Sequence, residues 1–154
     1  MIRRCCVALV VGCLAGMSAL AAEPDADVAK REKDILAHWQ GTFELISIED
    51  DGKSTTGDAL KSRKLTVEGA NYHFQNGAFN EHGSYRFDLT KLPKHLDIIV
   101  GDGADKGKVY LAAFDANEKQ ITICFQKKNE KRPDKLTGAA GSGMILEVWQ
   151  KVSK

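Results

Sequence analysis

The octapeptide GDGADKGK at residues 101–108 has the composition of a functional loop, because it combines glycine with aspartate and lysine. A phosphate-binding loop, GxxxxGK followed by Ser or Thr, would need glycine at Asp102 and a hydroxyl side chain at Val109. A calcium loop that begins at Asp102 would need oxygen ligands at three positions whose side chains carry none: Ala104, Lys106 and Ala113. We therefore interpret the segment as a hairpin connection whose glycines adopt positive φ angles.

The other residues with chemical reactivity are scattered along the chain. The four histidines lack the HxxxH or HxxE spacing of a helical zinc site: His38, His73, His82 and His95. Glu81 and His82 are neighbours on an expected strand, so their side chains point to opposite faces and do not form an acid–base pair. Cys124 lies between Ile123 and Phe125 with no adjacent base, and we interpret it as a small hydrophobic residue. The sequence predicts no metal, no cofactor and no catalytic residue, and therefore not an enzyme.

Short strands with tight turns between them account for most of the chain after residue 41. The expected strands cover residues 42–49, 64–68, 71–75, 78–89, 95–100, 108–114, 120–126 and 143–151. In NYHFQ (71–75), Tyr72 and Phe74 share one face, which is the alternation of a strand with one buried side. A bulge or a sharp bend is expected at Gly83, and a solvated loop at KKNEKRPDK (127–135). Eight short strands with no helical repeat between them predict an all-β fold, an eight-stranded antiparallel up-and-down barrel.

Residues 1–22 have the layout of a secretory signal peptide. Arg3 and Arg4 precede an apolar run that ends in an Ala-x-Ala pattern. Cleavage after this pattern predicts an exported protein, located in the periplasm, in the cell envelope or outside the cell. A retained membrane anchor is one alternative, and acylation of Cys13 in the lipobox-like VVGC is another.

A charged segment separates the signal peptide from the first strand. Residues 23–34 are rich in charge and poor in large apolar side chains, so we expect a flexible segment. Ile35, Leu36 and Trp39 are spaced for one short helical turn that leads into the barrel. The expected barrel domain therefore covers residues 35–154.

Removal of residues 1–22 changes the charge and the cysteine content of the chain. The net charge of +1 loses Arg3 and Arg4 but no acidic residue, and becomes −1. A near-neutral surface favours neither nucleic acid nor an anionic membrane as a partner, so membrane contact is expected only through residues 1–22 or a lipid on Cys13. Cys124 would be the one remaining cysteine, which excludes an internal disulfide in an oxidising compartment.

Several segments together resemble a known family. They are GTFELISIEDDGK (41–53), KLTVEG (64–69), GSYRFDLTKLPKHLDI (83–98), GADKGK (103–108), ITICF (121–125), RP (132–133) and GSGMILEVWQK (141–151). In order and spacing they resemble a family of small exported bacterial proteins with a lipocalin-like fold and no assigned activity. The resemblance implies a lipocalin-like barrel over residues 36–152 and no catalytic residues. Where that family carries Gly-x-Trp at the first strand, this chain has Phe43, and Lys151 is the basic residue that would pack over the ring.

Two classes of function are favoured for a barrel of this kind, and an enzyme is a third class for which the sequence offers no paired acid, base and nucleophile. In the first, the barrel binds a small apolar or amphipathic ligand, and inward-facing aromatic side chains line an apolar cup: Phe43, Tyr72, Phe74, Tyr85, Phe87, Phe114 and Phe125. In the second, the same rings fill the core, and the loops at 50–62 and 127–142 bind an envelope protein or act as an inhibitor. A cavity of a few hundred Å³ that opens at one end of the barrel would favour the first class.

Overall fold

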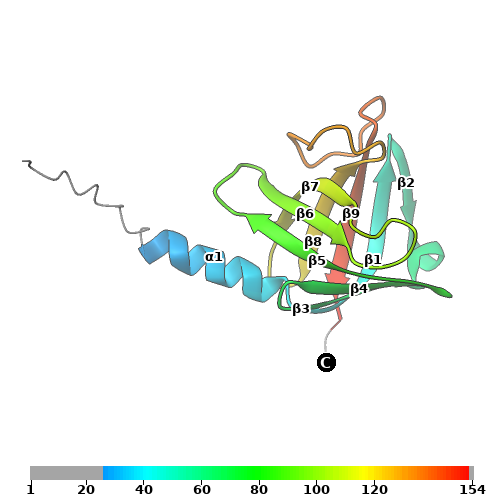
Figure 1. Ribbon diagram of the computed structural model, residues 1–154. Helices are drawn as coiled ribbons and strands as arrows, with labels where there is room; N and C mark the ends of the chain where they lie inside the picture. The colour runs from blue at the N-terminus through cyan, green and yellow to red at the C-terminus, as the bar shows by residue number, and fades with distance from the viewer. Residues whose placement is uncertain (1–25, 153–154) are drawn as a thin grey trace, which may run out of the picture.

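Nine strands and one α-helix make up the part of the chain that the computed structural model describes, residues 26–152 (Figure 1). The strands are β1 (Gly41–Asp50), β2 (Lys53–Thr56), β3 (Arg63–Glu68), β4 (Asn71–Asn76), β5 (Phe79–Asp88), β6 (Lys94–Val100), β7 (Val109–Ala116), β8 (Gln120–Gln126) and β9 (Met144–Lys151), and a short 3-10 helix, η1 (Gly57–Leu60), follows β2. They pair antiparallel in the order β2-β1-β3-β4-β5-β6-β7-β8-β9, and β1 also pairs with β9. The pairing of β1 with β9 closes eight of the strands into a barrel. The ninth strand, β2, pairs only with the second half of β1. The predicted eight-stranded antiparallel up-and-down barrel is confirmed.

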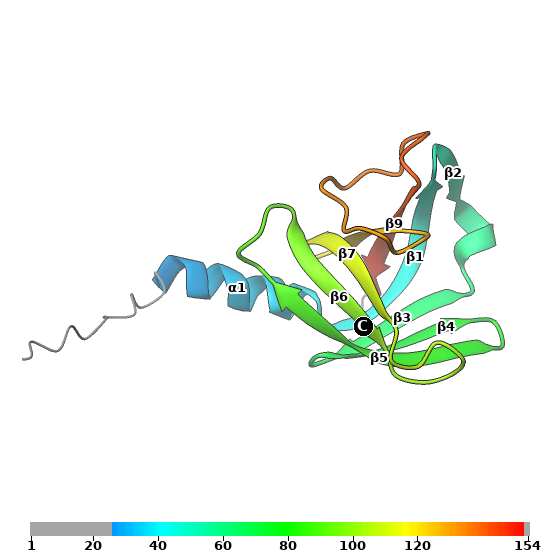
Figure 2. The ribbon, with the colours of Figure 1, turned by 45° about the horizontal axis from the view of Figure 1, so that its top comes forward.

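The helix α1 (Ala26–His38) precedes the barrel and points away from it in both ribbon views (Figure 1 and Figure 2). It is longer than the single turn expected, and it begins within residues 23–34, for which the sequence predicted flexibility. Ile35 packs partly buried against the barrel core, whereas Leu36 stays 37% exposed. Trp39, directly after the helix, is completely buried. The helix is therefore attached to the barrel at its C-terminal end.

Gly83 lies in the middle of β5 and keeps the register of this strand with both β4 and β6, so of the bulge or sharp bend expected there, the bulge is absent. A Cβ atom at this position would overlap with the ring of Tyr72 and with the carbonyl oxygen of Ile99. Glycine is therefore required by the close approach of its neighbours and not by a bulge. A register shift does occur in β1, between Leu45 and Ser47, where this strand pairs with β9.

The loop GDGADKGK joins β6 to β7, as the sequence predicted. Gly103 and Gly107 have φ angles of 70° and 86°, a region that residues with a Cβ atom rarely adopt. The backbone N–H of Gly107 donates a hydrogen bond of 2.8 Å to the carbonyl oxygen of Val100, and this bond helps to close the hairpin. The interpretation of this loop as a hairpin connection is confirmed.

The connection between β8 and β9, residues 127–143, packs against the outer face of the barrel. Arg132 donates a hydrogen bond of 2.7 Å to the carbonyl oxygen of Leu96 and forms an ion pair with Asp97. Burial alone would raise the pKa of Asp97, but hydrogen bonds from Arg132 and Arg86 outweigh it and lower the pKa below its ordinary value. The prediction of a solvated loop is therefore wrong at Arg132, which anchors the connection to β6.

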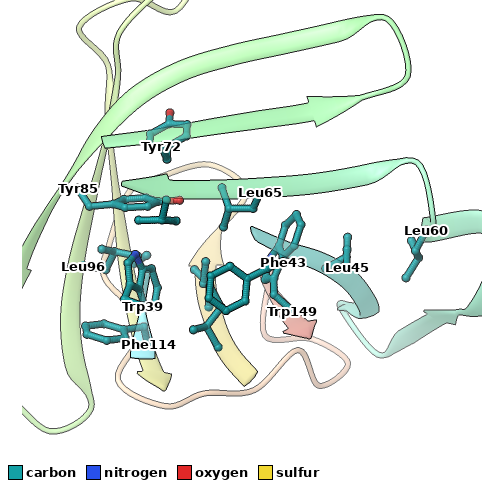
Figure 3. Close-up of a cluster of buried hydrophobic side chains, with 14 residues drawn as sticks. Trp39, Phe43, Leu45, Leu60, Leu65, Tyr72, Tyr85, Leu96, Phe114 and Trp149 are labelled. Carbon is teal, nitrogen blue, oxygen red and sulfur yellow. The ribbon is translucent and has the colours of Figure 1, made fainter. Parts of the chain in front are cut away.

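The interior of the barrel has two levels. At the end from which α1 leaves, large apolar side chains, among them Trp39, Phe43, Leu96 and Phe114, pack into a continuous core (Figure 3). Val67 and Ile121 also belong to this core, and Phe87 packs partly buried against it. We call this level the closed end. The opposite end, where β1 ends and β9 begins, is called the open end.

Candidate ligand-binding site

The open end of the barrel contains a pocket of about 360 Å³. Its apolar walls come from β3, β4, β5, β6, β8 and β9: Leu65, Tyr72, Phe74, Tyr85, Ile98, Ile123, Phe125 and Ile145. These side chains reach the pocket because alternate residues of each strand face the barrel interior. Tyr72 and Phe74 on β4, and Ile123 and Phe125 on β8, have this spacing of two. The pocket is thus the hollow part of the barrel interior.

The aromatic residues predicted for the site divide between the two levels of the barrel. Four of them line the pocket: Tyr72, Phe74, Tyr85 and Phe125. The other three lie in the packed core of the closed end: Phe43, Phe87 and Phe114. Alternation along a strand identifies inward-facing residues, but it does not tell how far along the barrel axis each one lies.

Trp39 is the side chain that fills the closed end (Figure 3). Its ring meets the rings of Tyr85, Phe87 and Phe114 edge-on, with centroid distances of 5.5, 5.4 and 4.8 Å. Edge-to-face contacts of this kind add to the stabilisation that burial provides. From its spacing in the sequence, Trp39 was expected only in a helical turn. Its position inside the barrel was not predicted.

A lysine covers a second ring at the closed end. Phe43 is completely buried, and Lys151 Nζ lies 5.7 Å from the centroid of its ring. The same ammonium group donates a hydrogen bond of 3.4 Å to the carbonyl oxygen of His38, which ties the end of β9 to the end of α1. The ammonium group therefore lies within cation–π distance of a buried aromatic ring of the first strand.

Glu147 on β9 places a carboxyl group among the apolar walls of the pocket. Its Oε2 accepts a hydrogen bond of 3.1 Å from the indole N–H of Trp149. Burial raises the pKa of Glu147 to about 7, although the Trp149 hydrogen bond and the charge of Arg63 act in the opposite direction. Glu147 was not among the residues predicted for the site. The sequence did contain a signal, because Glu147 alternates with Ile145 and Trp149 and must face inward with them.

Glu81 on β5 is the second carboxyl group in the pocket. The hydroxyl of Tyr72 donates a hydrogen bond of 2.8 Å to Glu81 Oε1. Burial raises the pKa of Tyr72 above its ordinary value and the bond to Glu81 raises it further, so this phenol remains protonated and acts as the donor. His82, the neighbour of Glu81, is exposed and stacks on His73 with ring centroids 4.2 Å apart. The prediction that the side chains of Glu81 and His82 point to opposite faces of the strand is confirmed.

The other polar groups of the pocket are bound to partners at its mouth. Lys127 Nζ forms an ion pair of 2.7 Å with Asp50 Oδ1. The hydroxyl of Tyr110 donates a hydrogen bond of 3.3 Å to Asp105 Oδ2. The charge of Lys127 is therefore matched by Asp50, while the two pocket carboxyl groups form no ion pair within the described part of the chain.

Metal-ligand clusters and Cys124 were the other chemical features that the sequence raised outside the pocket. Within residues 26–152 there is no group of three or more His, Cys, Asp or Glu side chains that could hold a metal ion. Cys124 is completely buried, and its thiol donates a hydrogen bond of 3.4 Å to the carbonyl oxygen of Thr137. Burial raises the pKa of this thiol, which lowers its reactivity. The interpretation of Cys124 as a small hydrophobic residue is confirmed.

The fold and the pocket define a small closed β-barrel with a hollow end. Comparison of the chain with family models, with curated proteins and with solved structures finds no match, so the site is defined by its own geometry. Among residues 26–152, no helix is long and apolar enough to cross a membrane. The predicted signal peptide and Cys13 lie outside the described residues.

Proposed function

We propose that this protein is an exported, lipocalin-like barrel that binds a small apolar or amphipathic molecule in the pocket at its open end. The observation that supports the proposal is the contrast between a filled closed end and a pocket of about 360 Å³ at the other end. Pockets for small molecules have volumes of roughly 300–1,000 Å³. Apolar walls stabilise a bound molecule by about 25 cal/mol per Å² of apolar surface removed from water.

Export and lipocalin-like character are parts of the same proposal and rest on the sequence. Export rests on the pattern of residues 1–22, and the lipocalin-like character rests on the family resemblance over residues 36–152. The pocket favours a ligand carrier over the second class of function, an interaction module without a ligand cavity.

A fluorescent dye and one pocket-filling substitution test the proposal. N-phenyl-1-naphthylamine, an uncharged dye whose emission rises in apolar surroundings, is titrated into the purified protein. Ile98→Trp, on the pocket wall, should abolish the rise because the indole takes up the space that the dye needs. Ile46→Trp, at an exposed position of β1, is the matched control and should bind the dye as the parent chain does.

Native mass spectrometry of the protein purified from its own cell envelope gives an independent measurement. We expect an additional mass that disappears when the protein is denatured. The proposal is overturned if the parent chain carries no such mass and does not bind the dye, or if Ile98→Trp binds the dye equally well. A protein partner would then be sought by cross-linking.

A further inference from the structure

Three polar groups that line the pocket have unused capacity for hydrogen bonds. Glu147 receives one hydrogen bond, from Trp149, and Glu81 receives one, from Tyr72. Each carboxyl group therefore keeps a second oxygen atom without a partner in the described part of the chain. The hydroxyl of Tyr85 forms no hydrogen bond there either. The pocket thus presents several acceptor oxygens to a ligand.

The charge inside the pocket is negative. Lys127 is the one cationic side chain among the lining residues, and its ammonium group is paired with Asp50 at 2.7 Å. The positive charge of Arg63 on β3 acts to lower the pKa of Glu147, but the two side chains form no ion pair in the described structure. The carboxyl groups of Glu81 and Glu147 therefore have no bound cation of their own.

The carboxyl groups of Glu81 and Glu147 both affect the pKa of the Tyr85 phenol, and both line the pocket together with aromatic side chains. Burial raises the pKa of Tyr85 most, followed by the neighbouring Tyr72 and then by the charges of Glu147 and Glu81. Tyr72 and Tyr85 are stacked, with ring centroids 4.7 Å apart. Carboxylates attract an organic ammonium ion through charge-assisted hydrogen bonds, and aromatic faces attract it through cation–π contacts.

We propose that the ligand is a small organic amine whose ammonium group binds Glu147 and whose apolar part lies against the aromatic walls of the pocket. This inference rests on the proposed ligand-binding function and specifies the class of ligand. An ammonium group has three N–H donors, and Glu147, Glu81 and Tyr85 offer acceptor oxygens on the walls of the same pocket. A carboxylate ligand would bring a further negative charge to these groups, and an uncharged ligand would desolvate Glu147 without supplying a counter-charge.

The inference predicts opposite pH dependences for cationic and uncharged ligands. The titratable and charged groups around Glu147 come from β1, β3, β4, β5, β7 and the start of the β8–β9 connection: Asp50, Arg63, Tyr72, Glu81, Tyr85, Tyr110 and Lys127. In this setting the pKa of Glu147 is about 7. An amine needs the ionised carboxylate, so its affinity should rise from about pH 5.5 to about pH 8. An uncharged molecule that covers the same group favours its protonated form, so its affinity should fall over that range.

Titration calorimetry with three probes of similar size separates the ligand classes. The probes are 2-phenylethylamine, 2-phenylethanol and 3-phenylpropanoate. Near pH 8 the amine should bind about tenfold more tightly than the alcohol, and the carboxylate should bind most weakly. Glu147→Gln should lower the affinity for the amine about tenfold and leave that for the alcohol within about twofold. Glu118→Gln, which changes an exposed carboxylate next to β8, is the matched control and should leave the affinity for the amine unchanged.

The outcomes distinguish this inference from the proposed function. The inference is overturned if the alcohol binds the parent chain as tightly as the amine, or if a folded Glu147→Gln variant keeps the full affinity for the amine. Dye binding that persists in this case leaves the ligand-binding function standing. If neither the dye nor any of the three probes binds, the proposed function itself fails. Should Glu147→Gln not fold, the pH dependence of amine binding to the parent chain decides the question without any variant.

Discussion

The two ends of the barrel are built from the same strands but differ in how completely side chains fill them. At the closed end, Trp39, Phe43 and Phe114 are fully buried in contact with other apolar groups. At the open end, Phe74 and Phe125 are only partly buried, and they border a pocket of about 360 Å³. One level of this small barrel is therefore packed as a core, while the other stays hollow.

A single strand contributes to both levels. On β9, Trp149 is 2% exposed and belongs to the core, whereas Glu147, two residues earlier, faces the pocket. The core fixes the backbone of the strand, so a carboxyl group with a pKa of about 7 can be held in an apolar setting. Perturbed groups of this kind are found preferentially at functional sites.

The largest effect is expected from Trp39→Ala, which removes the ring that fills the closed end. Truncation of a large buried aromatic side chain costs about 3–5 kcal/mol of unfolding free energy, because its contacts are lost and a cavity remains. Urea unfolding of the two proteins measures the difference. A loss below about 1 kcal/mol would show that the closed end is not the stabilising level.

A smaller effect, with a defined pH dependence, is expected from Glu147→Gln. The pKa of Glu147 rises from 4.5 in the unfolded chain to about 7 in the fold, so between these values the native state binds the proton more tightly. The stability of the parent chain should therefore fall as pH rises from about 4.5 to about 7. The variant lacks this loss, and near pH 8 it should be more stable by roughly 1–3 kcal/mol.

Urea unfolding near pH 4.5 and near pH 8 checks this prediction. At the lower pH the parent and the variant should have similar stability, since Glu147 is protonated in the native state. Glu118→Gln is the control and should show no stabilisation near pH 8. Equal effects of the two substitutions would mean that the open end does not bury Glu147 as described.

The smallest effect on stability is expected from Phe125→Ala. This ring lies on the pocket wall and is partly exposed, so its removal should cost about 1 kcal/mol or less. The substitution should instead enlarge the pocket and change the affinity for the dye. Unfolding and dye titration on the same samples measure both quantities. A loss as large as that of Trp39→Ala would contradict the distinction between the two levels.

Much of the fold could be predicted from local patterns in the sequence. In NYHFQ the alternation places Tyr72 and Phe74 on one face, and the structure has both of them inside the barrel. In GDGADKGK the glycines predict a hairpin, and Gly103 and Gly107 have the positive φ angles that such a turn requires. These features depend on residues close together in the sequence, so they can be predicted without the fold.

Other features depend on contacts between distant parts of the chain and could not be predicted in this way. The bulge expected at Gly83 is absent because the residue is instead constrained by Tyr72 and Ile99 on the two neighbouring strands. Arg132 was expected in a solvated loop, yet its partner Asp97 lies 35 residues away in the sequence. Such pairings are set by the closure of the barrel.

By itself, the sequence determined the eight strands of the barrel, the turns between them and the alternation that turns side chains inward, because strand alternation and turn chemistry are local. It did not indicate β2, which lies within the loop expected at 50–62. Only the tertiary structure decided the level of the barrel at which each inward side chain lies. That level depends on how the strands are staggered around the barrel. It also depends on Trp39, which precedes the first strand and whose buried side chain occupies the closed end. For this reason Phe114 became part of the core, whereas Phe125 and Glu147 came to line a pocket.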